Sequence, residues 1–310
     1  MEVKIAGELG YCAGVSKAIE KAMAYGDEHH QVYSLGTIAH NEAVVEILRR
    51  HGVEPIEPEE MIPQTHVAIT AHGAPLSLYA KIADLNCRPL DCTCPIVRKA
   101  QKVVSMLYRQ GYDILVFGDP GHQEVKGLVG WAWGNVKFVG LDPYQLDTTA
   151  LVKKVGTISQ TTQVPSDFFR FISRIFLLGL ENAREVRAFN TICPIVDARV
   201  IEARKLAAEV DIMFVVGSQA SANTNNLARV CMEAPIGGTK DPFDQVPDQR
   251  VYIVQGPDQV EQAIGDWVGR RGQQPKLAGL TAGTSTPIEV VEAVVQRLKE
   301  HHESHHDPEG

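Results

Sequence analysis

Three widely separated cysteines precede predicted helices, and this repeated arrangement constrains the fold more than any other feature of the sequence. Cys12 lies in Gly-Tyr-Cys-Ala-Gly-Val, while Cys94 and Cys193 each open a Cys-Pro-Ile-Val run. Apolar residues recur at helical spacing after each cysteine, and proline suits the first turn of a helix. The sequence therefore predicts three units in which a strand, a cysteine-bearing turn and a helix follow one another.

A thiol at the start of a helix is favoured as thiolate, because free N–H groups and the helix dipole stabilise negative charge. Thiolate is the form that binds metal, so Cys12, Cys94 and Cys193 are candidate ligands of one soft-metal centre. The alternative for any single cysteine is a small buried apolar residue. We expect that structural role for the cysteines outside the repeated context, Cys87, Cys92 and Cys231, although Cys92 lies close to Cys94.

Composition limits the class of protein. A chain of 310 residues can bury a large core in two or three domains. Its net charge of −8 argues against a nucleic-acid surface, and we find neither a signal peptide nor a stretch suited to crossing a membrane. Six cysteines in a chain of this length do not indicate a disulfide framework. We therefore expect a cytoplasmic protein with reduced thiols.

Polar turns follow several of the predicted strands. Since strands alternate with helices, the sequence indicates an α/β fold with ligands at the carboxyl ends of the strands. The polar residues of these turns are His40, His72, His122, Ser221, Asn223 and Ser285. Backbone N–H groups and hydroxyls at such turns can bind an anion, although helix capping is their ordinary role. Glu124, two residues after His122, is a candidate proton donor; the alternative is a solvent-facing acid at a helix start.

These motifs resemble those of the 4-hydroxy-3-methylbut-2-enyl diphosphate reductase family of isoprenoid biosynthesis. The resemblance covers nearly the whole chain and includes Ala-His-Gly, Thr-Cys-Pro-x-Val, Gly-His-x-Glu-Val-x-Gly, Gln-Thr-Thr and Asn-Thr-Ile-Cys in family order. It implies a three-lobed α/β trefoil with pseudo-threefold arrangement around a [4Fe-4S] cluster. The lobes implied are 13–93, 94–192 with a C-terminal helix at about 287–300, and 193–286 with the strand of 1–12. Residues 301–310 are expected to be a disordered tail.

The resemblance also implies roles for individual residues. Cys12, Cys94 and Cys193 match the three cluster ligands, which leaves one iron open to the substrate alcohol. The diphosphate would be bound by His40, His72, His122, Ser221, Asn223 and Ser285. Thr161 matches a residue near the alcohol, and Glu124 matches the proton donor. The implied reaction is reductive dehydroxylation of the allylic diphosphate to isopentenyl and dimethylallyl diphosphate, with a ferredoxin or flavodoxin as electron donor.

Two positions depart from the family pattern, since Ala222 replaces a usual serine and Val196 a usual threonine. Both bear on substrate affinity rather than on the reaction type. A zinc hydrolase is one alternative, because three protein ligands and an open position also describe catalytic zinc, but an all-thiolate set favours iron–sulfur. A second alternative is a cluster-bearing redox sensor that binds a diphosphate without converting it.

Overall fold

The fold is seen in a computed structural model, which describes residues 1–7, 9–151, 153–179, 183–234 and 250–304. The chain divides into two compact units: one contains Met1–Cys12, His40–Ala43 and 194–310, and the other contains Ala13–Ala39 and Val44–Cys193. The described strands form three four-stranded sheets, and every strand pairing is parallel. The prediction of an α/β protein with three sheet-containing lobes is confirmed.

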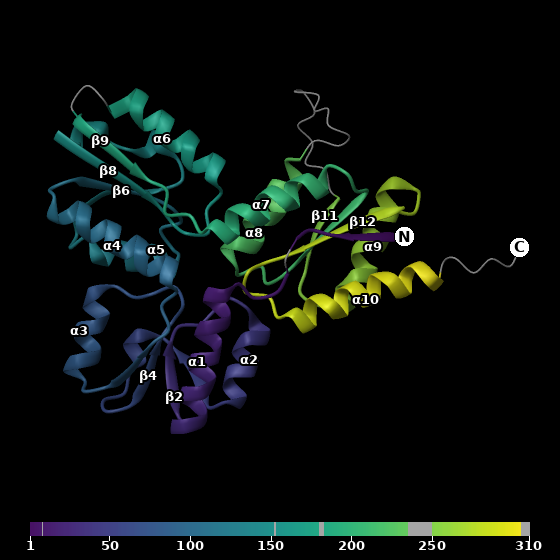
Figure 1. The fold of residues 1–310 in the computed structure, drawn as a ribbon, viewed down its shortest axis with the longest axis horizontal. Coiled ribbons are helices and arrows are strands. Elements are labelled where there is room, and N and C mark those ends of the chain that lie inside the picture. The colour runs from purple at the N-terminus through teal and green to yellow at the C-terminus, as the bar shows by residue number, and fades with distance from the viewer. Residues whose placement is uncertain (8, 152, 180–182, 235–249, 305–310) are drawn as a thin grey trace, which may run out of the picture. The chain divides into compact units, whose positions relative to one another are not determined.

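The first unit contains one sheet and the helices around it (Figure 1). The sheet has the order β1-β12-β10-β11, formed by Glu2–Ile5, Leu277–Ala282, Ile212–Val216 and Val251–Val254. Its helices are α7 (Pro194–Ala207), α8 (Ala222–Met232), α9 (Val260–Arg271) and α10 (Ile288–Ser304). Phe214, Leu280 and Trp267 are buried in its core, so the sheet is apolar on its faces, as expected of parallel strands covered by helices.

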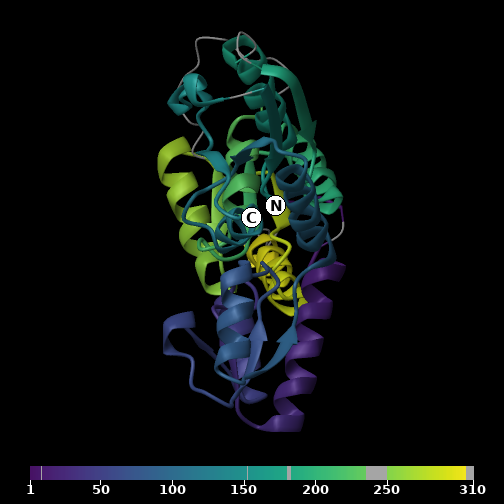
Figure 2. The ribbon, with the colours of Figure 1, turned by 90° about the vertical axis from the view of Figure 1, so that its left-hand side faces the viewer.

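The second unit contains two sheets. One has the order β3-β2-β4-β5, formed by Val53–Ile56, Val32–Leu35, His66–Ile69 and Arg88–Asp91. The other has the order β7-β6-β8-β9, formed by Val136–Gly140, Asp113–Phe117, Lys153–Ser159 and Ala183–Phe189. The helices are α1 (Ala13–His29), α2 (Glu42–Arg50), α3 (Leu76–Asp84), α4 (Pro95–Arg109), α5 (Gln123–Trp131) and α6 (Pro165–Gly179). Figure 2 shows α1, in purple, alongside its sheet, and α1 contacts β2 and β3.

The last helix corrects two expectations. We expected it to belong to the lobe of 94–192, but α10 packs against β1 and α9 in the first unit. Its apolar stripe of Val291, Val294 and Leu298 is buried in the same core as the sheet of that unit, and burial of such a stripe fixes where a helix docks. The helix also continues to Ser304, so the expected tail does not begin at His301; residues 305–310 lie outside the described residues.

His301 shows why the helix extends so far. Its side chain is largely buried, and Nδ1 lies 2.9 Å from Oε2 of Glu261 on α9. This contact and the buried Leu298 hold the last turn against α9. None of the described helices is both long and apolar enough to cross a bilayer.

Candidate active site

Each of the three candidate cysteines lies where the chain leaves one sheet and begins a helix on the next. Cys12 follows β1 and precedes α1, which packs against β2 and β3. Cys94 follows β5 and precedes α4, which packs against β6 and β8. Cys193 follows β9 and precedes α7, which packs against β12. The repeated sequence pattern therefore corresponds to three topologically equivalent connections.

The backbone fixes these cysteines in the same way three times. The amide N–H groups of Cys12, Cys94 and Cys193 donate to the carbonyl oxygens of Thr284, Ala71 and Thr161, at 3.2, 3.0 and 2.9 Å respectively. In each case the cysteine follows an edge strand, and the acceptor lies in the turn after the neighbouring strand. The bond thus extends the parallel ladder beyond the last strand residues. It also places each cysteine beside a turn that carries a candidate substrate residue.

The thiols divide into two groups by burial. Cys12, Cys94 and Cys193 are partly exposed, whereas Cys87, Cys92 and Cys231 are buried. Burial raises the pKa of Cys92 and of Cys231 to about 12, which keeps those thiols protonated and inert. All six cysteines lie in the described part of the chain and none forms a disulfide there. The three partly exposed thiols at helix starts therefore fit a soft metal centre, and the buried three do not.

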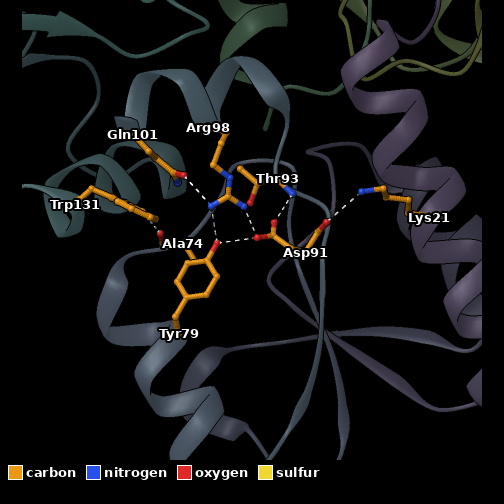
Figure 3. Close-up of polar contacts among 8 residues, drawn as sticks. All are labelled: Lys21, Ala74, Tyr79, Asp91, Thr93, Arg98, Gln101 and Trp131. Carbon is orange, nitrogen blue, oxygen red and sulfur yellow. Dashed lines mark hydrogen bonds and ion pairs between the residues drawn. The ribbon is translucent and has the colours of Figure 1, made fainter. Parts of the chain in front are cut away.

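A polar network supports the turn that carries Cys94 (Figure 3). Asp91 accepts from the Thr93 amide at 2.9 Å and forms an ion pair with Arg98. Tyr79 also donates to the Asp91 carboxylate, at 3.1 Å, and accepts from Arg98 at 3.2 Å. Burial alone would raise the pKa of Asp91, but bonds from Thr93 and Arg98 hold it below its ordinary value. Asp91 and Arg98 flank Cys94 in the sequence, so the pair closes the turn around it.

Glu124 is the most perturbed acid of the candidate site. It lies in the first turn of α5 and is only 1 % exposed. The backbone N–H of Thr161 donates to Oε1 at 2.6 Å, and the Thr161 hydroxyl donates to Oε2 at 2.8 Å. Burial raises the pKa of Glu124 to about 7, although the bonds from Thr161 act in the opposite direction. The carboxyl group is therefore poised to hold or release a proton near neutral pH.

Thr161 connects this acid to the third cysteine. Its hydroxyl and amide bind Glu124, while its carbonyl accepts the amide of Cys193 at 2.9 Å. The neighbouring Gln160 braces the same turn, since its Oε1 accepts from the Asp119 amide at 3.0 Å. We did not predict a role for Gln160; the only signal for it was its place in the Gln-Thr-Thr motif.

Two of the predicted histidines lie together in the second unit. The rings of His72 and His122 are 5.4 Å apart, edge to face. His122 caps α5, with Nδ1 accepting from the Glu124 amide at 3.1 Å. An accepting Nδ1 carries no proton, so in the neutral ring the proton is on Nε2, which is then a hydrogen-bond donor.

The other predicted polar residues lie in the first unit. The Ser285 hydroxyl donates to the His40 carbonyl at 3.3 Å, and burial lowers the pKa of the His40 ring. Ser221 caps α8, where its hydroxyl accepts from the Thr224 amide at 3.4 Å. Asn223 is 2 % exposed, and within the described residues neither atom of its amide has a hydrogen-bond partner. Buried amides are normally satisfied, so this one indicates a ligand.

The start of α8 lies close to the end of β12. A Cβ atom on Gly283 would lie 2.4 Å from Oγ1 of Thr224, which is closer than any side chain can approach. Glycine is therefore required here because the two turns pack backbone against side chain. Thr224 is buried, and its hydroxyl has no partner among the described residues. It is a second unsatisfied donor beside Asn223, and we did not single it out because threonine is common at helix starts.

Parallel sheets, a buried acid of near-neutral pKa and three equivalent cysteine turns are features of an α/β metalloenzyme. Comparison with known proteins agrees. The sequence model of the LytB protein family matches residues 3–299, and the chain belongs to that family.

Curated relatives share most of their length with this chain. It is 33 % identical to the 4-hydroxy-3-methylbut-2-enyl diphosphate reductase of Syntrophotalea carbinolica, over 97 % of this chain and 99 % of the relative. It is 34 % identical to the enzyme of the same name from Geobacter sp. strain M21, over 96 % and 97 %. The family resemblance seen in the sequence motifs is thereby confirmed.

Two solved structures are similar. The structure of (E)-4-hydroxy-3-methyl-but-2-enyl diphosphate reductase, described as the terminal enzyme of the non-mevalonate pathway, superposes with a TM-score of 0.63 at 30 % identity, covering 96 % of this chain and 99 % of the other. The Plasmodium falciparum E-1-hydroxy-2-methyl-but-2-enyl-4-diphosphate reductase superposes with a TM-score of 0.80 at 22 % identity, covering 96 % and 88 %. At 22 % identity, the second similarity shows a shared fold only.

Proposed function

We propose that this chain is a 4-hydroxy-3-methylbut-2-enyl diphosphate reductase that catalyses reductive dehydroxylation. The allylic alcohol takes up two electrons and two protons; its C–O bond breaks, water leaves, and a C–H bond forms to give isopentenyl or dimethylallyl diphosphate. The named relatives support this reaction. The observation that carries it is the buried Glu124, held by Thr161 with a pKa of about 7.

Glu124 is the proposed proton donor. Hydroxide is a poor leaving group, so the C–O bond breaks more easily when an acid protonates the departing oxygen. A carboxyl group with an ordinary pKa would be almost fully ionised at neutral pH, whereas burial keeps a large share of Glu124, about half, protonated there. Thr161 orients both carboxyl oxygens, and after proton transfer its two donors stabilise the carboxylate.

The diphosphate is proposed to bind through neutral donors. Asn223 offers a buried amide with no partner among the described residues, and Ser221 stands at the N-terminus of α8, where helix N–H groups attract anions. Ser285, Thr224 and the histidines His40, His72 and His122 complete the proposed set. An Nε2–H on His122 suits a phosphate oxygen because its Nδ1 is already accepting.

Cys12, Cys94 and Cys193 are the proposed ligands of a [4Fe-4S] cluster. Their partial exposure, their equivalent places in the topology and their position at helix starts support this assignment. When bound, such a cluster supplies the electrons one at a time and leaves one iron without a protein ligand for the substrate hydroxyl. A ferredoxin or flavodoxin in the cytoplasm is the proposed electron source.

Anaerobic turnover tests this function. The reconstituted protein is incubated with 4-hydroxy-3-methylbut-2-enyl diphosphate and a one-electron reductant, and the products are separated by chromatography. We expect isopentenyl and dimethylallyl diphosphate from the wild type and neither from Glu124→Gln, which keeps its iron. A protein that binds iron and the diphosphate but forms no product would instead be a redox sensor, and a colourless zinc protein would contradict the cluster.

A further inference from the structure

A buried arginine on α7 holds two turns of the first unit. Arg199 is 5 % exposed. Its Nη2 donates to the carbonyl of Gly10 at 2.9 Å, and its Nη1 donates to the carbonyl of Ala282 at 3.0 Å. Long cationic side chains are rarely buried this deeply without a structural or functional reason.

Both acceptors lie in the turns that define the position of Cys12. Gly10 is two residues before Cys12, and Ala282 ends β12, two residues before Thr284. The carbonyl of Thr284 accepts the amide of Cys12 at 3.2 Å. The rigid fork of one guanidinium therefore fixes the Cys12 turn and the turn that binds the Cys12 amide relative to each other.

We infer that Arg199 is a positioning residue for Cys12 and that its charge raises the reduction potential of the cluster bound there. The inference rests on the proposed function. Reduction adds negative charge to the cluster, and a nearby cation stabilises the reduced form. The guanidinium binds the backbone of Gly10, two residues before the Cys12 thiol, and a buried charge is less screened by salt than an exposed one.

Substitutions separate position from charge. Arg199→Lys keeps the charge but replaces the planar fork with a single ammonium, which cannot bind both carbonyls in the same geometry. Arg199→Met keeps an apolar stem of similar size and removes the charge as well as both hydrogen bonds.

Arg250 provides a matched control in the same sheet. It is 1 % exposed, and its Nη2 and Nη1 donate to the carbonyls of Ala234 and Val210 at 2.9 and 3.3 Å. It immediately precedes β11, at the amino end of the sheet, whereas Arg199 binds at the carboxyl end. Arg250→Met therefore removes a buried cation with the same kind of contacts but away from the Cys12 turn.

The test is an anaerobic redox titration of the loaded wild type, Arg199→Lys, Arg199→Met and Arg250→Met, followed by electron paramagnetic resonance. For Arg199→Met we expect the ratio of reduced to oxidised cluster to fall at least tenfold at a given potential, which for one electron corresponds to a midpoint lower by about 59 mV. Arg199→Lys should keep a midpoint near that of the wild type but change the g-values. Arg250→Met should lose thermal stability and keep the midpoint.

Equal midpoints in Arg199→Met and Arg250→Met would overturn the role of the Arg199 charge. Should Arg199→Met fail to fold, Arg199→Lys decides the positioning role: wild-type g-values in that variant would refute it. These outcomes leave the proposed function intact, because the wild type would still contain a cluster and convert the substrate. A wild type that binds no cluster would contradict the proposed function itself.

Discussion

Removing the Thr161 hydroxyl should raise the pKa of Glu124. Thr161→Val preserves the shape of the side chain and leaves the backbone N–H on Oε1 and the carbonyl on the Cys193 amide. It deletes only the donor to Oε2, which lies 2.8 Å away. That donor stabilises the ionised carboxylate more than the neutral acid, and it lowers the pKa of Glu124 in the wild type.

The size of the effect follows from the burial of the pair. A hydrogen bond to a charged group contributes about 1.5–3 kcal/mol, and one pH unit corresponds to about 1.4 kcal/mol, so the pKa of Glu124 should rise by about one to two pH units. The value should lie toward the upper end because Glu124 is fully enclosed and no water replaces the lost donor readily.

The assay is the pH dependence of kcat/KM, which reports ionisations of the free enzyme. Because the protonated form of Glu124 is the proposed donor, activity of the wild type should fall as the pH rises above about 7. In Thr161→Val the fall of kcat/KM should begin at a higher pH, whatever happens to the maximal rate. Thr157→Val, at a buried threonine of β8, the strand that precedes the Thr161 turn, is the matched control and should leave the pH of this fall unchanged. If kcat/KM of Thr161→Val falls at the same pH as in the wild type, or at a lower pH, the reasoning is refuted.

Three further predictions concern stability, affinity and the Cys94 turn. Glu124 has a raised pKa in the folded protein, so the wild type should lose up to about 3 kcal/mol of stability as the pH rises from about 4.5 to about 7; denaturant unfolding of Glu124→Gln should lack this slope. Ala222→Ser adds a hydroxyl between Ser221 and Asn223 and should lower KM more than it changes kcat, whereas an unchanged KM would show that this turn does not bind the diphosphate. Asp91→Asn removes the charge that pairs with Arg98 and should lower iron retention during gel filtration; retention equal to wild type would contradict a supporting role.

Most strands of the three sheets were predictable from the sequence, but three strands were not. The central strands β2, β6 and β10 are apolar and short, which is typical of buried parallel strands. The strands β3, β5 and β9, which we did not predict, all lie at sheet edges. Pro55 and Pro89 interrupt two of them, and proline is tolerated at an edge because one side of the strand needs no partner. The local sequence pattern of these edge strands was too weak to predict them, because they form by pairing with the adjacent strand.

Motifs in the sequence pointed to the residues of the candidate site but not to their connections. The cysteines, Glu124 and Asn223 were proposed from motifs, because the chemistry of the site calls for side chains of those kinds. The bonds from each cysteine amide to a neighbouring turn were not, since they join residues far apart in the sequence, such as Cys12 and Thr284. Arg199 was missed for the same reason: nothing in its local sequence distinguishes a buried guanidinium from a surface arginine on an amphipathic helix. The docking of α10 was likewise decided by packing rather than by its own pattern.

The most direct test of the account is the iron and sulfide content of six single Cys→Ser variants, reconstituted anaerobically side by side. We expect that Cys12→Ser, Cys94→Ser and Cys193→Ser each lose or degrade the cluster. Cys87→Ser, Cys92→Ser and Cys231→Ser, at the buried thiols, should retain four irons per chain, as a three-cysteine [4Fe-4S] centre requires. An intact four-iron cluster in any variant of the first group would contradict the ligand assignment. So would a Cys92→Ser protein that folds but contains no cluster.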